Sequence, residues 1–270
     1  MRLLNGLVGS LFDLLMRPLQ PFSLVSALFA VSLLTAAAIL IVVRLTSDQR
    51  AIAAVKRQIH ADLYEIRLFN DDLRAMLVTT LQILRHNARY LGLSIVSMLC
   101  VIAPAALILP QLQSFFGYSG LRVGQPVVIT AQLKSGRQPA ALETPPEISV
   151  ETPAIWMPAL NQVMWRIVPT APGDYLLQMR IADGTYDKTV HVSDGLARRS
   201  PARLEPGLLT ETFYPGEVPL PDGAAISSIH IDYPNSEIYM FGRRVHWIVL
   251  YAILSVAFAA FLRRPLRVEI

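Results

Sequence analysis

Long stretches without charged residues alternate with polar stretches along this chain of 270 residues. Residues 18–43, 90–121 and 245–262 contain no Lys, Arg, Asp or Glu. A helix needs about 20 mostly apolar residues to cross a hydrocarbon core about 30 Å thick. The pattern therefore predicts an integral membrane protein with three transmembrane helices, at residues 18–43, 90–112 and 244–262.

The composition agrees with this prediction, because 53% of the residues are hydrophobic and only 16% are charged. The first uncharged stretch could instead be the hydrophobic region of a secretory signal, which typically has 7–15 residues and ends at a small-residue cleavage site. This stretch is longer, begins after Arg17 and reaches Arg44 without a clear cleavage site. We therefore expect a retained transmembrane helix.

Apolar residues also recur at helical spacing before the first predicted span. Pro18 and Pro21 would break such a helix near the start of the uncharged stretch. We predict that residues 1–17 form an amphipathic helix at the membrane interface. The alternative is the beginning of one long helix that continues into the span. The apolar positions are Leu3, Leu4, Leu7, Val8, Leu11, Leu14 and Leu15.

A heptad pattern occupies residues 44–89, between the first two spans. Apolar side chains seven residues apart are typical of paired helices, and Asn70-Asp71-Asp72 interrupts them with residues that favour turns and helix N-caps. We predict a hairpin in which the first span continues as a helix to about Leu68, turns at Asn70 and returns from Asp71 into the second span. The predicted seam consists of Ile52, Ile59, Ile66 and Leu73, with Leu63, Leu77 and Leu84 at a second heptad position.

The period changes to that of β-strands after the second span. Short alternating or β-branched runs, separated by turns with Pro and Gly, predict a small antiparallel β-sandwich over residues 113–243. Ala171-Pro-Gly-Asp-Tyr175 resembles the corner at the end of immunoglobulin-like sandwiches, and residues 195–225 look irregular. The expected strands are 126–133, 147–151, 163–168, 175–181, 189–192 and 226–233, with a hairpin turn at Asp183-Gly184.

Basic residues predict the orientation of the spans. The positive-inside rule assigns the segment between the first two spans, and the tail 263–270, to the cytoplasm. The N-terminus and residues 113–243 then lie outside, across a prokaryotic inner membrane. The basic residues are not interleaved with stacking aromatic residues, so no nucleic-acid partner is expected. Those that carry the prediction are Arg44, Arg50, Lys56, Arg57, Arg67, Arg74, Arg85, Arg89, Arg263, Arg264 and Arg267, against Arg2 and Arg17.

Motifs for catalysis are missing from the sequence. It contains no Gly-x-Ser-x-Gly, no Gly-rich phosphate-binding loop and no His-Glu-x-x-His. The single cysteine, Cys100, lies in the second span, and Asp71-Asp72 are adjacent residues that suit a helix cap better than an acid/base pair. We expect no enzyme activity, cofactor, metal or disulfide. The histidines are scattered over the predicted regions at His60, His86, His191, His230 and His246.

The predicted order of spans and hairpin resembles the YidC/Oxa/EMC-subunit superfamily of membrane insertases, and is most similar to its short prokaryotic members of unassigned function. The stretches that carry the resemblance are Arg44-Leu-Thr-Ser-Asp-Gln-Arg-Ala-Ile52 and Asn87-Ala-Arg-Tyr-Leu91. The resemblance covers roughly residues 20–115 and 245–270. The predicted β domain between the second and third spans, residues 113–243, departs from the family plan.

The resemblance implies a polar groove, open to the cytoplasm and to lipid, that admits polar segments of a substrate into a thinned bilayer. Such a groove would lower a cost of about 2.5–3.5 kcal/mol for each charge inserted. For each candidate residue, the alternative is a snorkelling anchor or a packing side chain. The candidates are Arg44, Arg89, Ser94, Ser97 and Cys100, with Met76 and Met98 as adaptable apolar contacts.

Two functions therefore follow from the sequence. The first is an insertase-like factor whose partners are the lipid bilayer and membrane-protein substrates. The second is a non-catalytic anchor or scaffold subunit, with fixed membrane partners, whose outer β domain binds a protein. A wet, polar groove would favour the first function, whereas spans packed tightly through Leu, Ala and Ser would favour the second.

Overall fold

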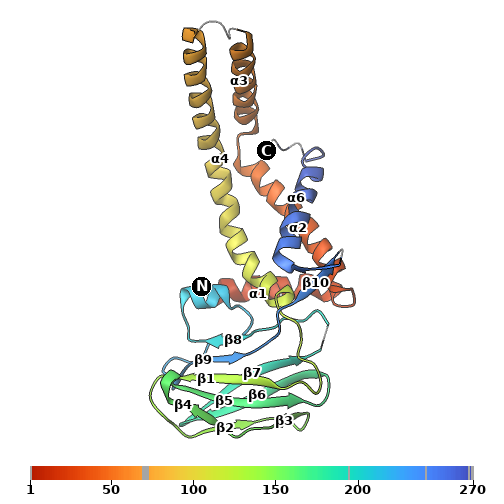
Figure 1. Ribbon diagram of the computed structural model, residues 1–270, viewed down its shortest axis with the longest axis vertical. Helices are drawn as coiled ribbons and strands as arrows, with labels where there is room; N and C mark the ends of the chain where they lie inside the picture. The colour runs from red at the N-terminus through yellow and green to blue at the C-terminus, as the bar shows by residue number, and fades with distance from the viewer. Residues whose placement is uncertain (1, 69–72, 194, 241, 267, 269–270) are drawn as a thin grey trace. The chain divides into compact units, whose positions relative to one another are not determined.

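The protein is described here from a computed structural model (Figure 1), which divides it into two compact units. One unit combines Met1–Leu28 with Leu107–Leu250 and contains the β-strands; we call it the sandwich unit. The other combines Phe29–Ala106 with Tyr251–Ile270 and is helical. The residues that the structure describes are 2–68, 73–193, 195–240, 242–266 and 268.

Within the described part of the chain, two helices are long and apolar enough to cross a membrane, as judged by length and composition: α2 and α4. Helix α6 is also apolar but has 16 residues, or about 24 Å, which is shorter than a typical span. The described helices are α1 (Arg2–Met16), α2 (Leu24–Thr46), α3 (Gln49–Leu68), α4 (Leu73–Phe116), α5 (Leu208–Phe213) and α6 (Trp247–Leu262), with 3-10 turns at Arg17–Leu19 and Pro158–Leu160.

The N-terminal helix is separate from the first apolar helix. Helix α1 ends at Met16, and the 3-10 turn that follows contains Pro18, as the prolines predict. Phe12 and Met16 are buried, whereas Leu11 and Leu14 remain more than 60% exposed. The helix therefore has one face packed in its own unit and an apolar face without cover there.

The prediction that the first span continues as a helix to Leu68 is wrong. Helix α2 ends at Thr46 and α3 begins at Gln49. Asp48 caps α3, because its Oδ1 accepts hydrogen bonds from the backbone N–H groups of Arg50 (3.1 Å) and Ala51 (3.0 Å). The predicted turn at Asn70-Asp71-Asp72 lies outside the described residues.

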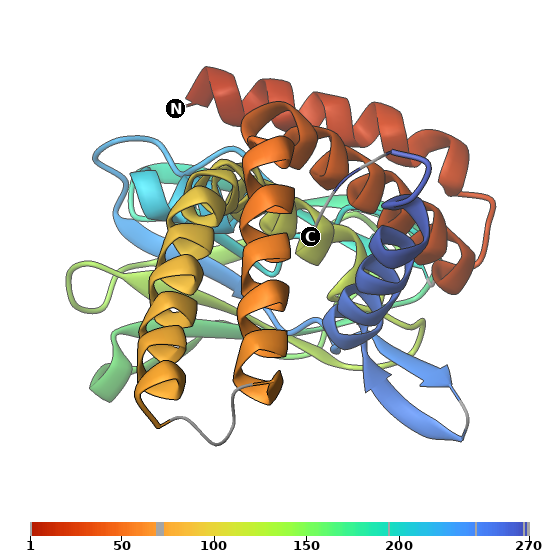
Figure 2. The same ribbon diagram turned by 90° about the horizontal axis from the view of Figure 1, so that it is seen from above.

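Helices α3 and α4 lie side by side, as Figures 1 and 2 show. Ile52 is 5% exposed, and Ile59 and Ile66 are half-buried, which is consistent with the predicted seam. The side chain of Leu73 is outside the described part of the chain. The second heptad position was placed one residue too late: Val55 and Asp62 are buried instead, whereas Leu63, Leu77 and Leu84 are 49%, 60% and 67% exposed.

A polar pair lies within this seam. Nδ1 of His86 is 2.6 Å from Oδ2 of Asp62, and the two side chains are only 24% and 10% exposed. Near the other end of the contact, Nζ of Lys56 lies 5.8 Å from the ring centre of Tyr90. The face of α4 that meets α3 therefore includes Thr79, which is buried, together with His86 and Tyr90.

Antiparallel strands form two main sheets, although β2 and β4 were not among the predicted strands. One has the order β3-β5-β1-β9-β8, with β4 also paired to β5, and the other has the order β2-β6-β7. A separate hairpin, β10–β11, precedes α6. The strands are β1 (Val127–Leu133), β2 (Ala140–Glu143), β3 (Ile148–Val150), β4 (Ile155–Met157), β5 (Gln162–Pro169), β6 (Gly173–Ile181), β7 (Gly184–Val192), β8 (Ala202–Leu204), β9 (Ile226–Ile231), β10 (Glu237–Met240) and β11 (Arg243–His246).

Some strand boundaries differ from the prediction. The β6–β7 turn consists of Ala182 and Asp183, because Gly184 already pairs with Ile181. Residues 195–225 are not wholly irregular, since they contain β8 and α5. The hairpin β10–β11 was not predicted, because its Arg243-Arg244 and Glu237 positions hide the alternation.

Alternating apolar side chains from both sheets meet in one core. The end of the sandwich is closed as the sequence predicts: the Tyr175 hydroxyl donates to the carbonyls of Ala171 (3.1 Å) and Pro172 (3.2 Å). Gly173 has φ +156°, and a Cβ there would lie 2.9 Å from the Tyr175 hydroxyl oxygen. Glycine thus allows the tyrosine ring to fold back on the chain.

Trp247 fixes the start of α6 beside the end of α4. Its side chain is fully buried, and Nε1 donates to Oε1 of Gln113 at 3.0 Å. Its ring stacks on Phe116, with 6.3 Å between ring centres. Helices α4 and α6 therefore leave the sandwich unit from neighbouring points.

Candidate functional site

The predicted groove residues lie on α2 and α4. Arg44 is in the last turn of α2 and Arg89 is on α4, and both are exposed. Met98 and Cys100 are also exposed on α4. No ion pair within the described part of the chain includes either arginine, and no described contact brings the two together. Their grouping in a groove stays a prediction.

The serines of the predicted groove give it little support. The Ser94 hydroxyl donates to the carbonyl of Tyr90, one turn earlier in the same helix, at 2.9 Å. Because this bond already pairs the hydroxyl within its own helix, the side chain does not require a polar groove. The side chain of Ser97 lies outside the described residues, and Met76 is half-buried.

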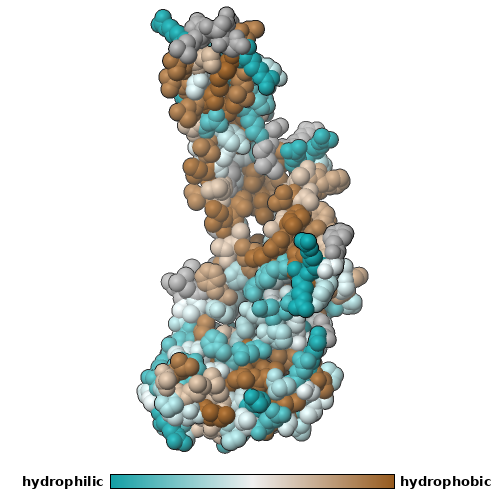
Figure 3. Space-filling model, in the orientation of Figure 1, coloured by the Kyte–Doolittle hydropathy of each residue, from teal (hydrophilic) through white to brown (hydrophobic). Residues whose placement is uncertain are grey.

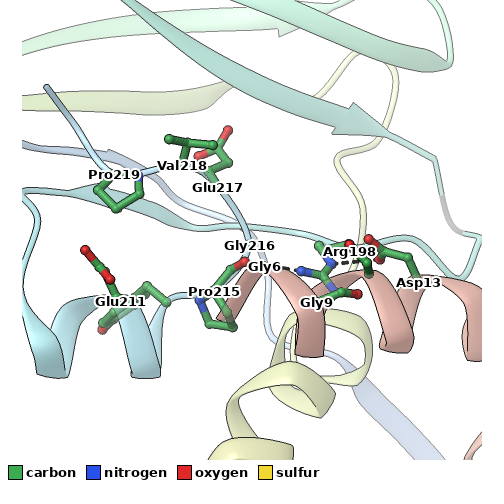
Figure 4. Close-up of a pocket in the computed structure, with 12 residues that line it drawn as sticks. Gly6, Gly9, Asp13, Arg198, Glu211, Pro215, Gly216, Glu217, Val218 and Pro219 are labelled. Carbon is green, nitrogen blue, oxygen red and sulfur yellow. Dashed lines mark hydrogen bonds and ion pairs between the residues drawn. The ribbon is translucent and has the colours of Figure 1, made fainter. Parts of the chain in front are cut away.

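A different polar centre lies in the sandwich unit, around Arg198 (Figure 4). The Arg198 Nε atom is 3.0 Å from Oδ1 of Asp13, and its Nη2 donates to the Gly9 carbonyl at 3.0 Å. Its Nη1 donates to the Pro215 carbonyl at 3.2 Å, and the guanidinium lies over the Phe115 ring, 5.2 Å from its centre. One side chain therefore joins α1, the end of α4 and the segment after α5.

Burial of Arg198 makes this contact set costly to break. Its side chain is 16% exposed, and desolvation lowers its pKa, while the charge of Asp13 acts in the opposite direction. Gly9 is buried, and a Cβ at that position would lie 3.3 Å from Arg198 Nη1. The absence of a side chain at Gly9 lets the guanidinium reach the helix backbone.

The neighbouring residue, Arg199, performs the same task for another segment. Its Nη1 donates to the Tyr118 carbonyl at 2.9 Å, and its Nη2 to the carbonyls of Ser193 (2.8 Å) and Gly195 (2.5 Å). Arg199 is buried, with only 2% of the residue exposed. Consecutive arginines thus secure α1 on one side and the chain that follows α4 on the other.

Lys188 and Glu217 form a third buried connection. Lys188 is at an inward position of β7, where it donates to Glu217 and, at 2.7 Å, to the Ser200 carbonyl. The other Glu217 oxygen, Oε1, accepts from the Thr189 backbone N–H at 2.8 Å. Desolvation lowers the Lys188 pKa and the Glu217 charge partly opposes this. The pair holds the segment after α5 against β7.

Two cavities flank these connections and share Asp13, Arg198, Gly216 and Glu217 as lining residues. The first has a volume of about 300 Å³ and lies between α1 and the segment 211–219 (Figure 4). The second, of about 370 Å³, reaches His191, whose Nδ1 is 2.6 Å from Oδ1 of Asp174. The remaining polar lining residues of the first cavity are Ser10, Glu211 and Tyr214.

The arrangement is suited to fastening and binding. The charged groups Arg198, Arg199, Lys188 and Glu217 all contact other parts of the protein. Among the described residues, no three His, Cys, Asp or Glu side chains are grouped as metal ligands. This centre was not predicted from the sequence. The available signal was Arg198-Arg199 in a Pro- and Gly-rich segment, with Asp13 as a lone acid in an apolar helix.

Comparison with known proteins identifies no relative: no family model, curated protein or solved structure matches this chain.

Proposed function

We propose that this protein is a non-catalytic membrane scaffold subunit, which holds its β-sandwich at the membrane surface for a protein partner. The contact set of Arg198 carries the proposal. It fastens α1, a helix with Leu11 and Leu14 exposed, to the sandwich unit. A helix with one apolar face free suits the lipid interface. The sandwich would then be held flat against the bilayer rather than tethered by a flexible linker.

In this proposal α2, residues 90–112 of α4, and α6 cross the inner membrane. The Trp247–Gln113 hydrogen bond supports this crossing, because it joins α4 and α6 where both enter the sandwich unit, on one side of the bilayer. Helix α6 has 16 residues, so it would require local thinning of the bilayer or flanking residues that reach the interface. The hairpin α3–α4 and the tail would lie in the cytoplasm.

The packing of α2 also favours a scaffold. Its buried positions are small or apolar and include Val31, Ser32, Ala36 and Leu40. Phe29 of α2 and Phe258 of α6 meet edge to face, with 6.0 Å between ring centres. Close packing of this kind is typical of stable membrane helix pairs.

The cavity between α1 and residues 211–219 is our candidate for the partner-binding surface. It lies beside exposed apolar side chains, Phe213 at 59% and Val218 at 77%. A segment of a partner with apolar side chains and backbone polar groups would suit this surface, since Ser10 and Tyr214 line the cavity next to it.

Insertion of membrane proteins is the second candidate, favoured by the short α6. A thinned bilayer would lower the cost of passing polar segments. Arg44 and Arg89, both exposed, would then attract acidic segments at the cytoplasmic side.

Photocrosslinking distinguishes the two functions. A crosslinking residue at Val218 should capture one partner of fixed mass, also after translation has been stopped, whereas a crosslinker at Leu176, 52% exposed on β6, should not. A crosslinker at Ser97 should capture nascent chains only if the protein is an insertase.

Charge reversal adds a functional measurement. If Arg44→Glu/Arg89→Glu protein is abundant and folded, the scaffold proposal expects normal insertion of other membrane proteins after depletion of the wild type. Failed insertion, together with nascent chains captured at Ser97, would replace the scaffold with the insertase.

A further inference from the structure

Helix α4 carries a second heptad stripe on the side away from α3. Its members follow one another at alternating steps of four and three residues, without interruption, for more than six turns. Each is exposed, and the larger side chains are between 49% and 67% exposed. The stripe consists of Leu77, Leu81, Leu84, Ala88, Leu91, Ile95, Met98 and Ile102.

The other face of α4 is already occupied. His86 contacts Asp62 of α3, Tyr90 lies near Lys56, and Thr79 is buried. These positions fall opposite the stripe on the helix, so α3 cannot cover both faces. Figure 3 shows hydrophobic surface along the hairpin.

Lipid does not account for the whole stripe. Its first half lies between Arg74 and Arg89, with Arg85 among its neighbours, in the part of α4 that precedes the uncharged stretch. Four exposed apolar positions, Leu77 to Ala88, therefore lie beyond the predicted span. A large exposed apolar surface of this kind marks an interaction site.

We propose that the stripe is the interface of a parallel homodimer, in which α4 pairs with α4 of a second copy. A strict heptad spacing specifies a left-handed pair of helices. The step sizes place Leu77, Leu84, Leu91 and Met98 at position d and Leu81, Ala88, Ile95 and Ile102 at position a. Leucine at d, with isoleucine at a, favours two parallel strands.

The flanking positions fit a second copy. In a parallel pair, the facing g and e residues would be Thr80 with Arg85, and Asn87 with Gly92, so these flanking positions bring no like charges together. A Cβ at Gly92 would meet no atom within 4 Å, which leaves room for a close approach of the two helices. Two copies in one membrane would also present identical stripes at the same depth.

The parallel orientation rests on the proposed membrane crossing of α4, but not on the choice between scaffold and insertase. Cysteine crosslinking in membranes tests the dimer in a Cys100→Ser background. When isolated membranes are treated with a mild oxidant such as copper phenanthroline, Leu84→Cys and Leu91→Cys should each form a disulfide with the same residue of a second copy. Gln82→Cys, exposed on the same helix but outside the stripe, is the matched control and should not.

Copies with tags of two sizes identify the partner. Co-expression should give a disulfide-linked species of mixed size at Leu84→Cys. A crosslink to a different protein, or equal crosslinking at Gln82→Cys, would overturn the proposal. So would the absence of any dimer from Leu84→Cys protein whose thiol reacts with a maleimide.

A second variant keeps the proposal independent of crosslinking. Leu81→Gln/Leu84→Gln changes two side chains that are each 67% exposed, so the hairpin should keep its protease resistance. The dimer measured by energy transfer between labelled copies in liposomes should be lost, whereas Gln82→Ala should leave it unchanged. Unchanged energy transfer in the double variant would overturn the dimer. Separate labelling of cysteines on the two sides of the membrane reveals a failure of the assumed topology.

Discussion

Asp62 of α3 and His86 of α4 face one another across the hairpin, with 2.6 Å between Oδ2 and Nδ1. Asp62 lies seven residues after the buried Val55, so it occupies a position of the seam that is apolar one heptad earlier. Buried polar groups cost stability unless they are paired. A hydrogen-bonded pair at one level of an apolar seam can fix the register of two helices.

Removal of one partner should therefore destabilise the hairpin. Asp62→Leu or His86→Leu leaves a buried polar group unpaired, at a cost of about 1–3 kcal/mol. Asp62→Leu/His86→Leu should recover most of that loss. Chemical denaturation of the purified variants, followed by circular dichroism, measures the difference. Additive losses in the double variant would show that the two side chains do not act as a pair.

The register of the seam gives a second test. Val55→Asp buries a charge at a position that is 2% exposed, so the hairpin should lose more than about 2 kcal/mol. Leu63→Asp changes a side chain that is 49% exposed and should cost much less. Limited proteolysis between residues 49 and 90 reports the difference. Equal sensitivity of the two variants would restore the register predicted from the sequence.

The attachment of α1 depends on Arg198. Arg198→Met should release the helix, with a loss of about 1.5–3 kcal/mol expected for hydrogen bonds to a charged group. Arg180→Met breaks an ion pair with Glu143 in which the side chains are 63% and 47% exposed, and should cost at most about 1 kcal/mol. Hydrogen exchange of residues 6–16 measures the release. Protection that is unchanged in Arg198→Met would remove the basis of the scaffold proposal.

The strengths and failures of the sequence prediction have physical causes. Alternation located β1, β5 and β6 because their inward positions are apolar. It found only the end of β7, because the inward position between Tyr186 and Val190 is Lys188. A buried lysine is tolerated there only through its distant partner Glu217. Such a pairing leaves no local pattern in the sequence.

The second heptad position was predicted wrongly for a related reason. Heptad spacing alone fits more than one stripe on α4, and the leucines at 77 and 84 belong to the exposed one. The face that meets α3 contains Thr79 and His86, which are polar and were not counted as seam positions. The Arg198 centre was out of reach because its partners lie at residues 9, 13 and 215.

Lys188 and Glu217 should respond unequally to substitution. Lys188 is fully buried and the Glu217 side chain is 13% exposed, with a backbone hydrogen bond from Thr189 as well. Glu217→Leu should therefore cost more stability than Lys188→Met, since it leaves the lysine without its charged partner; breaking such pairs costs about 3–5 kcal/mol. Lys188→Met/Glu217→Leu should be close to the wild type. Denaturation at neutral pH measures all three.

The pH dependence of the same variants has a definite sign. Burial lowers the Lys188 pKa below its ordinary value of 10.5, so in the window between the two values the unfolded chain binds more protons than the folded one. Stability from this group therefore rises as the pH increases through that window. Without Glu217 the pKa should fall further. The unfolding free energy of Glu217→Leu should then begin to rise at a lower pH than that of the wild type, and the double variant should lack this contribution.

Topology is the prediction on which the membrane proposals depend. In a Cys100→Ser background, single cysteines at Arg67, at the end of α3, and at Asp183, in the β6–β7 turn, both occupy exposed positions. Eight basic residues precede the second span, from Arg44 to Arg89, so Arg67→Cys should be cytoplasmic and Asp183→Cys outside. A maleimide that does not cross membranes should label only Asp183→Cys in intact spheroplasts, and both after lysis. Labelling of both cysteines before lysis, or of neither, would mean that α4 does not cross the membrane. Helix α6 provides an internal check, because a cysteine at Arg264 should behave like the one at Arg67 if this short helix also crosses.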